Sequence, residues 1–339
     1  MKMKSYIYLA VATAMVMVSC AKDEIFAPQT ESFTITATIS NSETRTSYVD
    51  ETADPTKGLK VEWEANETIS VVELTAGGTY NNKYWTFTSD NVAGAKATFT
   101  APAGFETTEG CKYIAIYPAL TDGAGGPYAG VTSSNCSALL RENTNYLEYG
   151  WFNNDYYRQT GVASMDLLKS YDVMVSAIEF NEGKANIDLA KMFSVIKLDL
   201  TLPAEAAGTQ IYQMNLASDS KWWISNGGVS LSDIIEGNYK WAYASTVVKE
   251  ANIRLRNSED TDYMTVPNDC KISIYLPCPG NKEGQFLMAT KFPASSTFTI
   301  TVLGAGGSNK YSASKTMGET TTYLMQGTVN VIKATLAKE

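Results

Sequence analysis

The polarity of the chain alternates residue by residue along many short stretches. Phe33–Ser40 reads "FTITATIS", in which apolar residues alternate with threonine or serine without a break. Val195–Leu202, "VIKLDLTL", is close to the same pattern. An alternation with a period of two places one set of side chains on a core and the other set in solvent. Both stretches therefore predict half-buried β-strands.

Other short runs, mostly rich in β-branched or aromatic residues and bounded by Gly, Asn, Asp or Pro, predict further strands. They are Ile69–Leu74, Tyr84–Thr88, Ala97–Ala101, Tyr113–Tyr117, Val173–Ala177, Ile272–Leu276, Phe286–Thr290, Thr297–Leu303 and Val329–Leu336. Helical periodicity is scarce, and only Met165–Tyr171 predicts a short helix. The "GAGG" at Gly304–Gly307 predicts a hairpin turn. This pattern indicates an all-β protein built of β-sandwiches.

The length of 339 residues is enough for about two domains of roughly 150 residues each. A short internal echo agrees with this, because "CKYIAIYP" at Cys111–Pro118 aligns without gaps to "CKISIYLP" at Cys270–Pro277. The polar "NEGK" at Asn181–Lys184 is the most plausible boundary. We therefore expect an N-terminal domain at 46–180 and a C-terminal domain at 181–339. Thr121–Asn145 reads as a long loop within the first of them.

The N-terminus has the layout of a secretory signal. Lys2 and Lys4 are followed by the apolar run Ile7–Val18, and the small residue Ser19 precedes Cys20. The apolar run is too short for a membrane span, which needs about 18 or more residues. Met17–Cys20 resembles a bacterial lipobox, in which the signal is cut between Ser19 and Cys20 and the Cys20 thiol is acylated. We expect residues 1–19 to be the signal peptide.

Acylation of Cys20 would hold the protein to a membrane, since each buried methylene contributes about 0.8 kcal/mol. The acidic "KDE" at Lys22–Glu24 resembles the tag that Bacteroidetes lipoproteins carry when they are moved to the outer face of the outer membrane. We therefore expect an outer-membrane protein exposed on the cell surface, with the membrane as a partner through acylated Cys20.

Charge and composition exclude several classes of function. The net charge is −9, and loss of the signal peptide removes two lysines and no acidic residue, which gives −11. An acidic chain argues against a nucleic-acid partner, because contacts from Lys and Arg to phosphates dominate that affinity. The sequence contains no histidine, which excludes Ser-His-Asp and Cys-His catalysis and argues against a transition-metal site. We expect no cofactor, no metal and no enzymatic activity.

Four cysteines remain besides Cys20. Cys270 and Cys278 bracket a predicted strand, so their Cα atoms would lie about 25 Å apart, whereas a disulfide needs less than about 7 Å. These two should not pair with each other. A disulfide between Cys111 and Cys136 stays open as an alternative to buried free thiols.

Several stretches, taken in order, resemble the fimbrillin superfamily of Bacteroidales, the lipoprotein subunits of type V pili. "TRTSY" at Thr44–Tyr48 is followed by "WEANETISV" at Trp63–Val71, and "YIAIYP" fits at Tyr113–Pro118. The usual Gly-Asp before the isoleucine is replaced by Asn66-Glu67-Thr68. The resemblance covers nearly the whole chain. It implies two transthyretin-like β-sandwich domains in tandem and a fimbrial or adhesive role.

The resemblance also implies a way of assembly. A surface protease cuts after an arginine and releases the lipid-linked N-terminal segment, here residues 20–45 with the strand Phe33–Ser40. A strand from another pilus subunit then fills the groove, which is strand addition to a sheet. Arg45 is the first arginine in the chain and lies in a polar stretch, so we expect cleavage between Arg45 and Thr46. Stalk, tip and anchor roles remain open.

A different class of function is a monomeric glycan-binding surface lipoprotein. Trp222 and Trp223 are adjacent, and neighbouring residues of a strand point to opposite faces, so one indole would be core and the other exposed. An exposed indole could stack on a sugar ring of a host or bacterial surface ligand. The simpler interpretation is that one indole packs in the core and the other packs on the surface.

Overall fold

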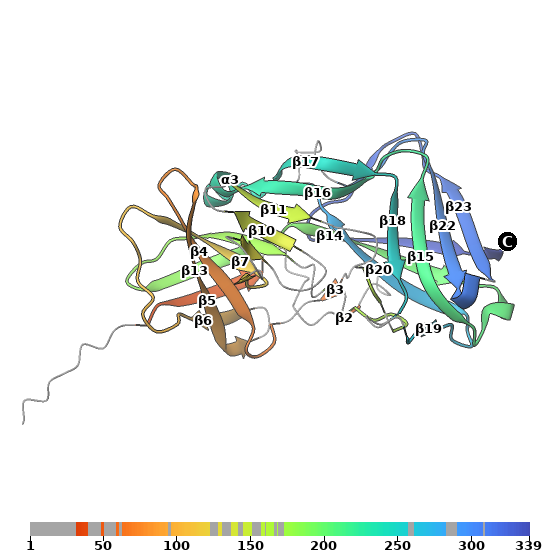
Figure 1. The fold of residues 1–339 in the computed structure, drawn as a ribbon, viewed down its shortest axis with the longest axis horizontal. Coiled ribbons are helices and arrows are strands. Elements are labelled where there is room, and N and C mark those ends of the chain that lie inside the picture. Colours follow the sequence, from red (N-terminus) through yellow and green to blue (C-terminus); the bar gives the residue numbers. More distant parts are fainter. Residues whose placement is uncertain are drawn as a thin grey trace, which may run out of the picture. The chain divides into compact units, whose positions relative to one another are not determined.

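Short strands dominate the computed structural model of the protein. It describes residues 32–39, 49–50, 59–60, 63–93, 96–122, 128–130, 137–141, 145–150, 157–159, 161–165, 168, 173–256, 261–282, 290–307 and 309–339. Phe33–Glu339 form one compact unit. The prediction of an all-β fold is confirmed (Figure 1). The expected strand Phe286–Thr290 and the expected helix Met165–Tyr171 lie mostly outside the described residues.

The first group of strands forms a closed barrel. Its strands, in the order in which they are paired, are β1 (Thr34–Ile39), β13 (Lys184–Lys191), β12 (Met174–Ile178), β7 (Lys112–Tyr117), β4 (Thr68–Leu74), β5 (Tyr80–Ala93) and β6 (Lys96–Thr100). Antiparallel pairing of β1 with β6 closes the ring.

Two sheets contain most of the strands after residue 192. One is β20 (Lys271–Pro279), β14 (Phe193–Thr201) and β25 (Val329–Thr335). The other is β18 (Glu250–Arg254), β15 (Gln210–Ser218), β22 (Thr297–Gly304), β23 (Lys310–Thr316) and β26 (Ala337–Lys338), with β19 (Met264–Thr265) paired to β15. The turn Ala305–Gly307 joins β22 to β23, which confirms the predicted hairpin.

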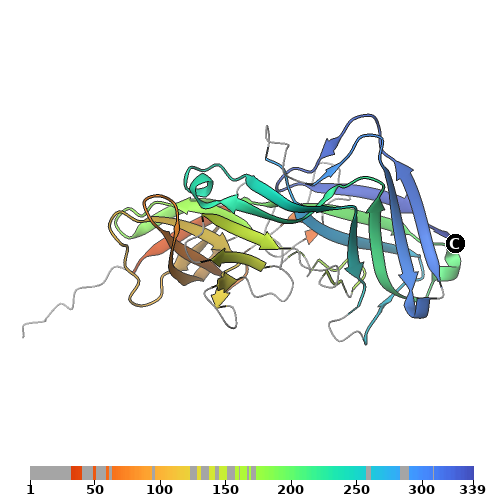
Figure 2. The ribbon, with the colours of Figure 1, turned by 45° about the horizontal axis from the view of Figure 1, so that its top comes forward.

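A further sheet combines strands from distant parts of the chain. It contains β17 (Trp241–Val248), β16 (Trp223–Ser230), β11 (Tyr146–Gly150), β10 (Ser137–Arg141), β9 (Tyr128–Gly130) and β8 (Thr121–Asp122). Figures 1 and 2 show β16 and β17 side by side along β11. Short two-stranded pairs are β2 (Val49–Asp50) with β3 (Leu59–Lys60), and β21 (Lys291–Phe292) with β24 (Thr322–Tyr323).

The same order of strand pairings occurs twice along the chain. β1 pairs in parallel with β13 and antiparallel with β6, and β14 pairs in parallel with β25 and antiparallel with β20. β4 lies between β5 and β7, as β15 lies between β18 and β22. β7 then pairs with β12, as β22 pairs with β23.

The two similar segments Cys111–Pro118 and Cys270–Pro277 do not occupy equivalent strands in this repeated pairing order. "KYIAIY" is β7, which lies between β4 and β12, whereas "KISIYLP" lies in β20, which pairs with β14. Eight alternating residues match by chance because strands share a polarity pattern. The domain boundary between residues 180 and 181 stays a prediction. Three strand pairings join its sides: β1 with β13, β12 with β13, and β11 with β16.

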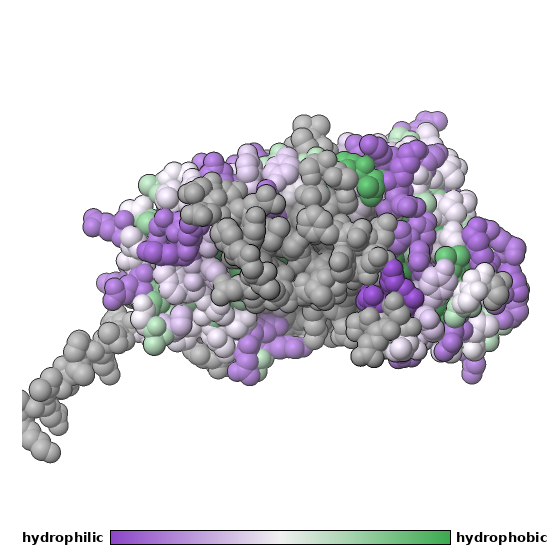
Figure 3. Space-filling model, viewed as in Figure 1, coloured by the Kyte–Doolittle hydropathy of each residue, from purple (hydrophilic) through white to green (hydrophobic). Residues whose placement is uncertain are grey.

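The apolar residues form two main clusters. One fills the barrel and includes Ile35, Ile69, Phe87 and Phe99. The other includes Val72, Ile114 and Val175 on the outward face of the barrel strands and continues through β14, β15, β16 and β20. β4 is therefore buried on both faces, and Ser70 and Glu73 are buried in it along with its apolar residues. The surface facing the viewer in Figure 3 is mainly hydrophilic where residues are described.

Candidate functional site

Strand β1 fills the gap between two other strands of the barrel. Its backbone pairs in parallel with β13 from Thr34 to Ile39 and antiparallel with β6 from Thr34 to Thr38. Phe33 extends this pairing, because its carbonyl accepts a hydrogen bond from the Ala101 amide. Both edges of β1 are therefore used, and its removal would open the barrel.

The side chains of β1 divide by face. Ile35 and Ala37 are fully buried and Ile39 is 6% exposed, whereas the threonines between them are half-buried. Thr38 Oγ1 donates a hydrogen bond to the Ile187 carbonyl at 3.2 Å and also bonds Asp188. The strand contains no charged residue, so backbone pairing and apolar burial hold it in place. Any strand with the same alternation of apolar and polar residues could make the same backbone pairing and bury the same apolar face.

Phe33 packs at the start of β1 against two aromatic rings. Its ring centroid lies 4.9 Å from that of Phe105 and 5.3 Å from that of Phe180, both in edge-to-face geometry. Phe105 also contacts Trp85 and Phe87 edge-to-face. Phe105 lies in a glycine-containing loop, and sequence reasoning missed it because a single aromatic residue in a loop has no periodic pattern.

The loop that holds Phe105 is fixed by a buried carboxylate, Glu73 of β4. Its side chain is fully buried and accepts hydrogen bonds from Asn81 Nδ2 at 2.6 Å, Thr108 Oγ1 at 2.7 Å and the Tyr113 hydroxyl at 3.1 Å. Lys83 Nζ lies 3.4 Å from Glu73 Oε1. Thr108 belongs to the same loop as Phe105, so Glu73 helps to seat the ring that contacts Phe33.

These partners decide the ionisation of Glu73. Burial raises the pKa of the carboxyl group, but the hydrogen bonds from Thr108, Asn81 and Tyr113, together with Lys83, outweigh it and leave the pKa below its ordinary value. Burial and the Glu73 charge raise the pKa of the Cys111 thiol. With its oxygens engaged in this way, Glu73 has a structural role and is not poised for proton transfer.

The expectation that one of the two adjacent tryptophans is exposed is wrong. Trp222 is 1% exposed and Trp223 is 2% exposed. Their rings contact each other edge-to-face at 5.2 Å, and Trp222 Nε1 donates to the Lys249 carbonyl at 2.7 Å. Alternation exposes one residue only where one face of a strand meets solvent, and here both indoles join the same core cluster. Neither offers a face to a sugar ring.

The residues expected for lipidation and proteolysis lie outside the described parts of the chain. These are Ser19, Cys20, Arg45 and Thr46, and Cys136 lies outside them as well. Cys111, Cys270 and Cys278 are free thiols, and the last two lie at opposite ends of β20. Burial raises the pKa of the Cys278 thiol far above its ordinary value.

The described residues meet the requirements of neither a metal site nor a membrane-spanning helix. Within the described ranges, no group of three or more His, Cys, Asp or Glu residues could hold a metal ion. No helix among those ranges is both long and apolar enough to cross a membrane.

Known proteins were compared at the level of sequence and of structure. No model of a protein family matches the chain, and no curated protein matches it by sequence. Solved structures do match. A Bacteroides uniformis protein named for cell adhesion is 13% identical, covers 92% of this chain and 98% of its own, and gives a TM-score of 0.42.

Two more Bacteroides structures are similar. A protein of Bacteroides ovatus, also named for cell adhesion, is 12% identical, covers 91% of this chain and 96% of its own, and gives a TM-score of 0.44. A fimbrial protein of Bacteroides vulgatus is 11% identical, covers 80% and 91% of the two chains, and gives a TM-score of 0.34. The names of these neighbours refer to cell adhesion or to fimbriae. At such scores the likeness assigns no residue and no mechanism.

Proposed function

We propose that the protein is a surface lipoprotein that acts as a fimbrial subunit or adhesin and assembles by proteolysis-triggered donor-strand exchange. The observation that carries the proposal is the position of β1 within the barrel. This strand is the first described element of the chain, has both edges paired, and buries its apolar face in the barrel. It directly follows the segment that the lipid would anchor and precedes the segment that contains Arg45.

Loss of β1 would have two energetic consequences. The backbone groups of β6 and β13 that face it would lose their partners, and such open edges favour pairing with another chain. Removal of Ile35 and Ile39 would also expose the apolar surface of the barrel interior that they cover. Burial of each such side chain contributes about 1.5–3 kcal/mol to stability, and this contribution would be lost. A strand from another subunit would remove both costs, and head-to-tail repetition would give an open filament.

The proposal places the precursor in the outer membrane, with acylated Cys20 as its anchor and other subunits as its partners. Cleavage between Arg45 and Thr46 would separate the folded unit from the lipid. Catalysis has no part in this function.

The test is intact mass and N-terminal sequencing of the protein taken from the cell surface, combined with electron microscopy for filaments. We expect a start at Thr46 in the assembled form. An Arg45→Ala variant should be exported but keep acylated Cys20 and form no filaments. Thr44→Ala, in the same segment, is the matched control and should mature normally.

Two results would contradict the proposal. Normal filaments from Arg45→Ala would show that cleavage at Arg45 is not required. A wild-type protein that starts at acylated Cys20 and never polymerises would leave a monomeric surface binder as the better description.

A further inference from the structure

The outward face of the sheet β20–β14–β25 carries an ordered grid of side chains. Residues of β14 alternate between the core and this face, so Ile196, Leu198 and Leu200 are buried inside while Lys197, Asp199 and Thr201 face outward. The register places Lys197 beside Tyr275 and Val331, and Asp199 beside Ser273 and Lys333. Thr201 lies beside Lys271 and Thr335.

One half of this face is apolar and covered. Tyr275 forms a cluster with Leu168, and Met165, Val195 and Val329 pack against it. Gln159 ties the cover to β20, because its Nε2 donates to the Ser273 carbonyl at 2.8 Å and its Oε1 accepts from the Tyr275 amide at 3.1 Å.

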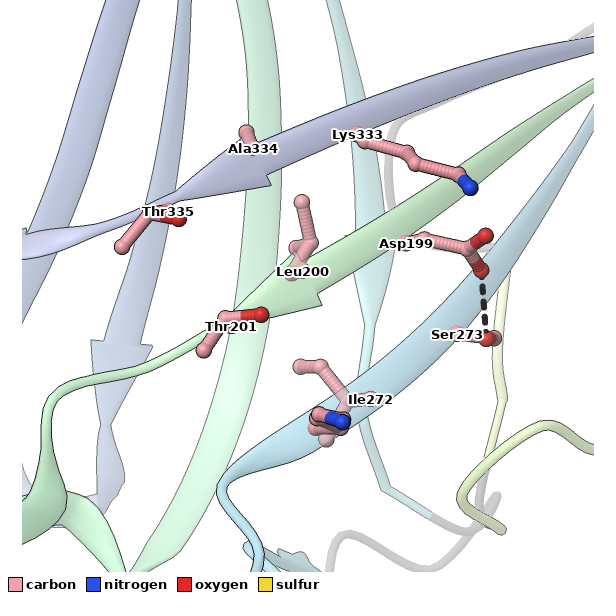
Figure 4. A pocket seen from close by; sticks show the side chains of 9 residues that line it. Asp199, Leu200, Thr201, Ile272, Ser273, Lys333, Ala334 and Thr335 are labelled. Carbon is pink, nitrogen blue, oxygen red and sulfur yellow. Dashed lines mark hydrogen bonds between the residues drawn. The ribbon is translucent and has the colours of Figure 1, made fainter.

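The other half of the face is polar and hollowed. A cavity of about 400 Å³ lies there, and its polar lining consists of Asp199, Thr201, Lys271, Ser273, Lys333 and Thr335. Figure 4 shows the Lys333 side chain extending toward the Asp199 carboxylate, and Ser273 hydrogen-bonded to the same carboxylate. The volume lies within the range of about 300–1,000 Å³ that is typical of small-ligand sites.

Asp199 is held in a fixed position in the floor of this cavity. Ser273 Oγ donates to Asp199 Oδ1 at 2.7 Å, and Lys197 Nζ lies 3.4 Å from the same oxygen. The Lys197 side chain is 9% exposed and that of Asp199 is 29% exposed, so the ammonium is shielded from water while the carboxylate remains accessible. The charges of Lys197 and Asp199 cancel, so this ion pair makes no net contribution to the charge of the cavity.

The remaining charge in the cavity is positive. Lys271 and Lys333 form no ion pair with another described residue, although the chain as a whole carries a net charge of −9. They flank β14 on opposite sides. Two strand spacings of about 4.8 Å and a two-residue offset separate their Cα atoms by about 12 Å. Two ammonium groups can therefore converge on one anionic group above β14.

We propose that this cavity binds an acidic saccharide, with Lys271 and Lys333 on its carboxylate or sulfate ester. The hydroxyls of Thr201 and Thr335 and the Asp199 carboxylate then bond the sugar hydroxyls. Charge-assisted hydrogen bonds are the strong contribution, and the neutral ones set orientation. The volume and the mixed hydroxyl and carboxylate lining fit a sugar better than a bare inorganic anion. The inference is independent of strand exchange, because no residue of β1 lines the cavity.

The test is titration calorimetry on the full, unpolymerised chain. The probes are trigalacturonate, its methyl ester, a sulfated disaccharide and inorganic sulfate. We expect binding of at least one acidic saccharide, weakening with added salt, and no binding of the methyl ester. Binding of trigalacturonate alone assigns a carboxylate, and binding of the sulfated sugar alone assigns a sulfate ester. No binding of either, equal binding of the methyl ester, or equal binding of inorganic sulfate would overturn the proposal.

Variants locate the site. Lys271→Glu with Lys333→Glu should weaken binding at least about tenfold. Lys184→Glu with Lys315→Glu makes the same charge change at exposed lysines of β13 and β23 and should leave affinity within about twofold. Thr201→Val with Thr335→Val leaves the charge unchanged and should weaken binding about three- to tenfold. Equal losses in the two lysine pairs, or full affinity in the Lys271 and Lys333 variant, would refute this location, provided that thermal unfolding shows each variant to be folded.

Discussion

At the scale of single residues, Glu73 connects the barrel to the loop that covers the start of β1. A carboxylate at full burial is costly unless it is paired and hydrogen-bonded. Here the side chains of Asn81, Thr108 and Tyr113 donate to it, and Lys83 approaches from the surface. The loop 101–111 is therefore attached to β4 by a charged acceptor as well as by the Phe105 ring.

This arrangement predicts how stability depends on pH. The pKa of Glu73 is lower in the folded protein than in the unfolded chain, so its contribution is present above the unfolded pKa. It is lost as the pH falls through the folded pKa. Glu73→Gln should lower the free energy of unfolding by about 1–3 kcal/mol at neutral pH, and the difference from wild type should shrink in acid.

Urea unfolding at a series of pH values measures this difference. Glu106→Gln in the exposed part of the same loop is the control and should behave as wild type at each pH. If the difference in unfolding free energy between Glu73→Gln and wild type stays constant as the pH falls, the variant is destabilised by altered packing or hydrogen-bond geometry and not by loss of the charge.

At the scale of elements, β1 and its neighbour β6 were predicted, whereas its other neighbour β13 was missed. "FTITATIS" alternates without interruption, and strand Thr34–Ile39 matches it. β13 alternates just as regularly, yet the preceding "NEGK" made Lys184 look like a domain boundary. β15 has a register shift between Ile211 and Gln213, which breaks the period of two.

Two adjacent glycines are the reason why strand β16 was not predicted. Gly227 and Gly228 suggest a turn, but both lie within β16. A Cβ at Gly228 would come within 2.6 Å of the Tyr243 ring, so the absent side chain makes room for that ring. The partners of β1 and of Glu73 could not be predicted because their register comes from long-range packing, such as Ala37 with Ile187, that no local pattern encodes.

The packing of β1 can be measured directly in the full chain. Ile35→Ala removes buried methyl groups from the barrel interior and should cost about 2–5 kcal/mol of unfolding free energy. Thr36→Ala, next along the strand on the opposite face, should cost less than about 1 kcal/mol. Urea unfolding compares the two. A similar cost for both would show that β1 is held by its backbone ladder and not by its apolar face.

At the scale of the whole molecule, the larger apolar cluster has no gap between the barrel and the later sheets. Val72, Ile114 and Val175 of the barrel strands belong to the same cluster as Ile196, Ile274 and Trp222. Helix α3 (Leu231–Ile235) contacts both β7 and β12 of the barrel, and it follows β16 directly. The repeated pairing order thus describes two similar groups of strands that share the larger of the two apolar clusters.

A shared core predicts that Phe33–Glu339 unfolds in one cooperative step. Hydrogen exchange followed by mass spectrometry should give the same free energy for the most protected amides of β4 and of β14. Leu231→Ala, at a fully buried position of α3, should lower both values together by about 2–5 kcal/mol. Glu236→Ala, at the exposed C-terminal end of the same helix, is the control. If Leu231→Ala lowers only one of the two values, the barrel and the later sheets unfold separately. The contacts across the shared cluster would then not make their unfolding cooperative.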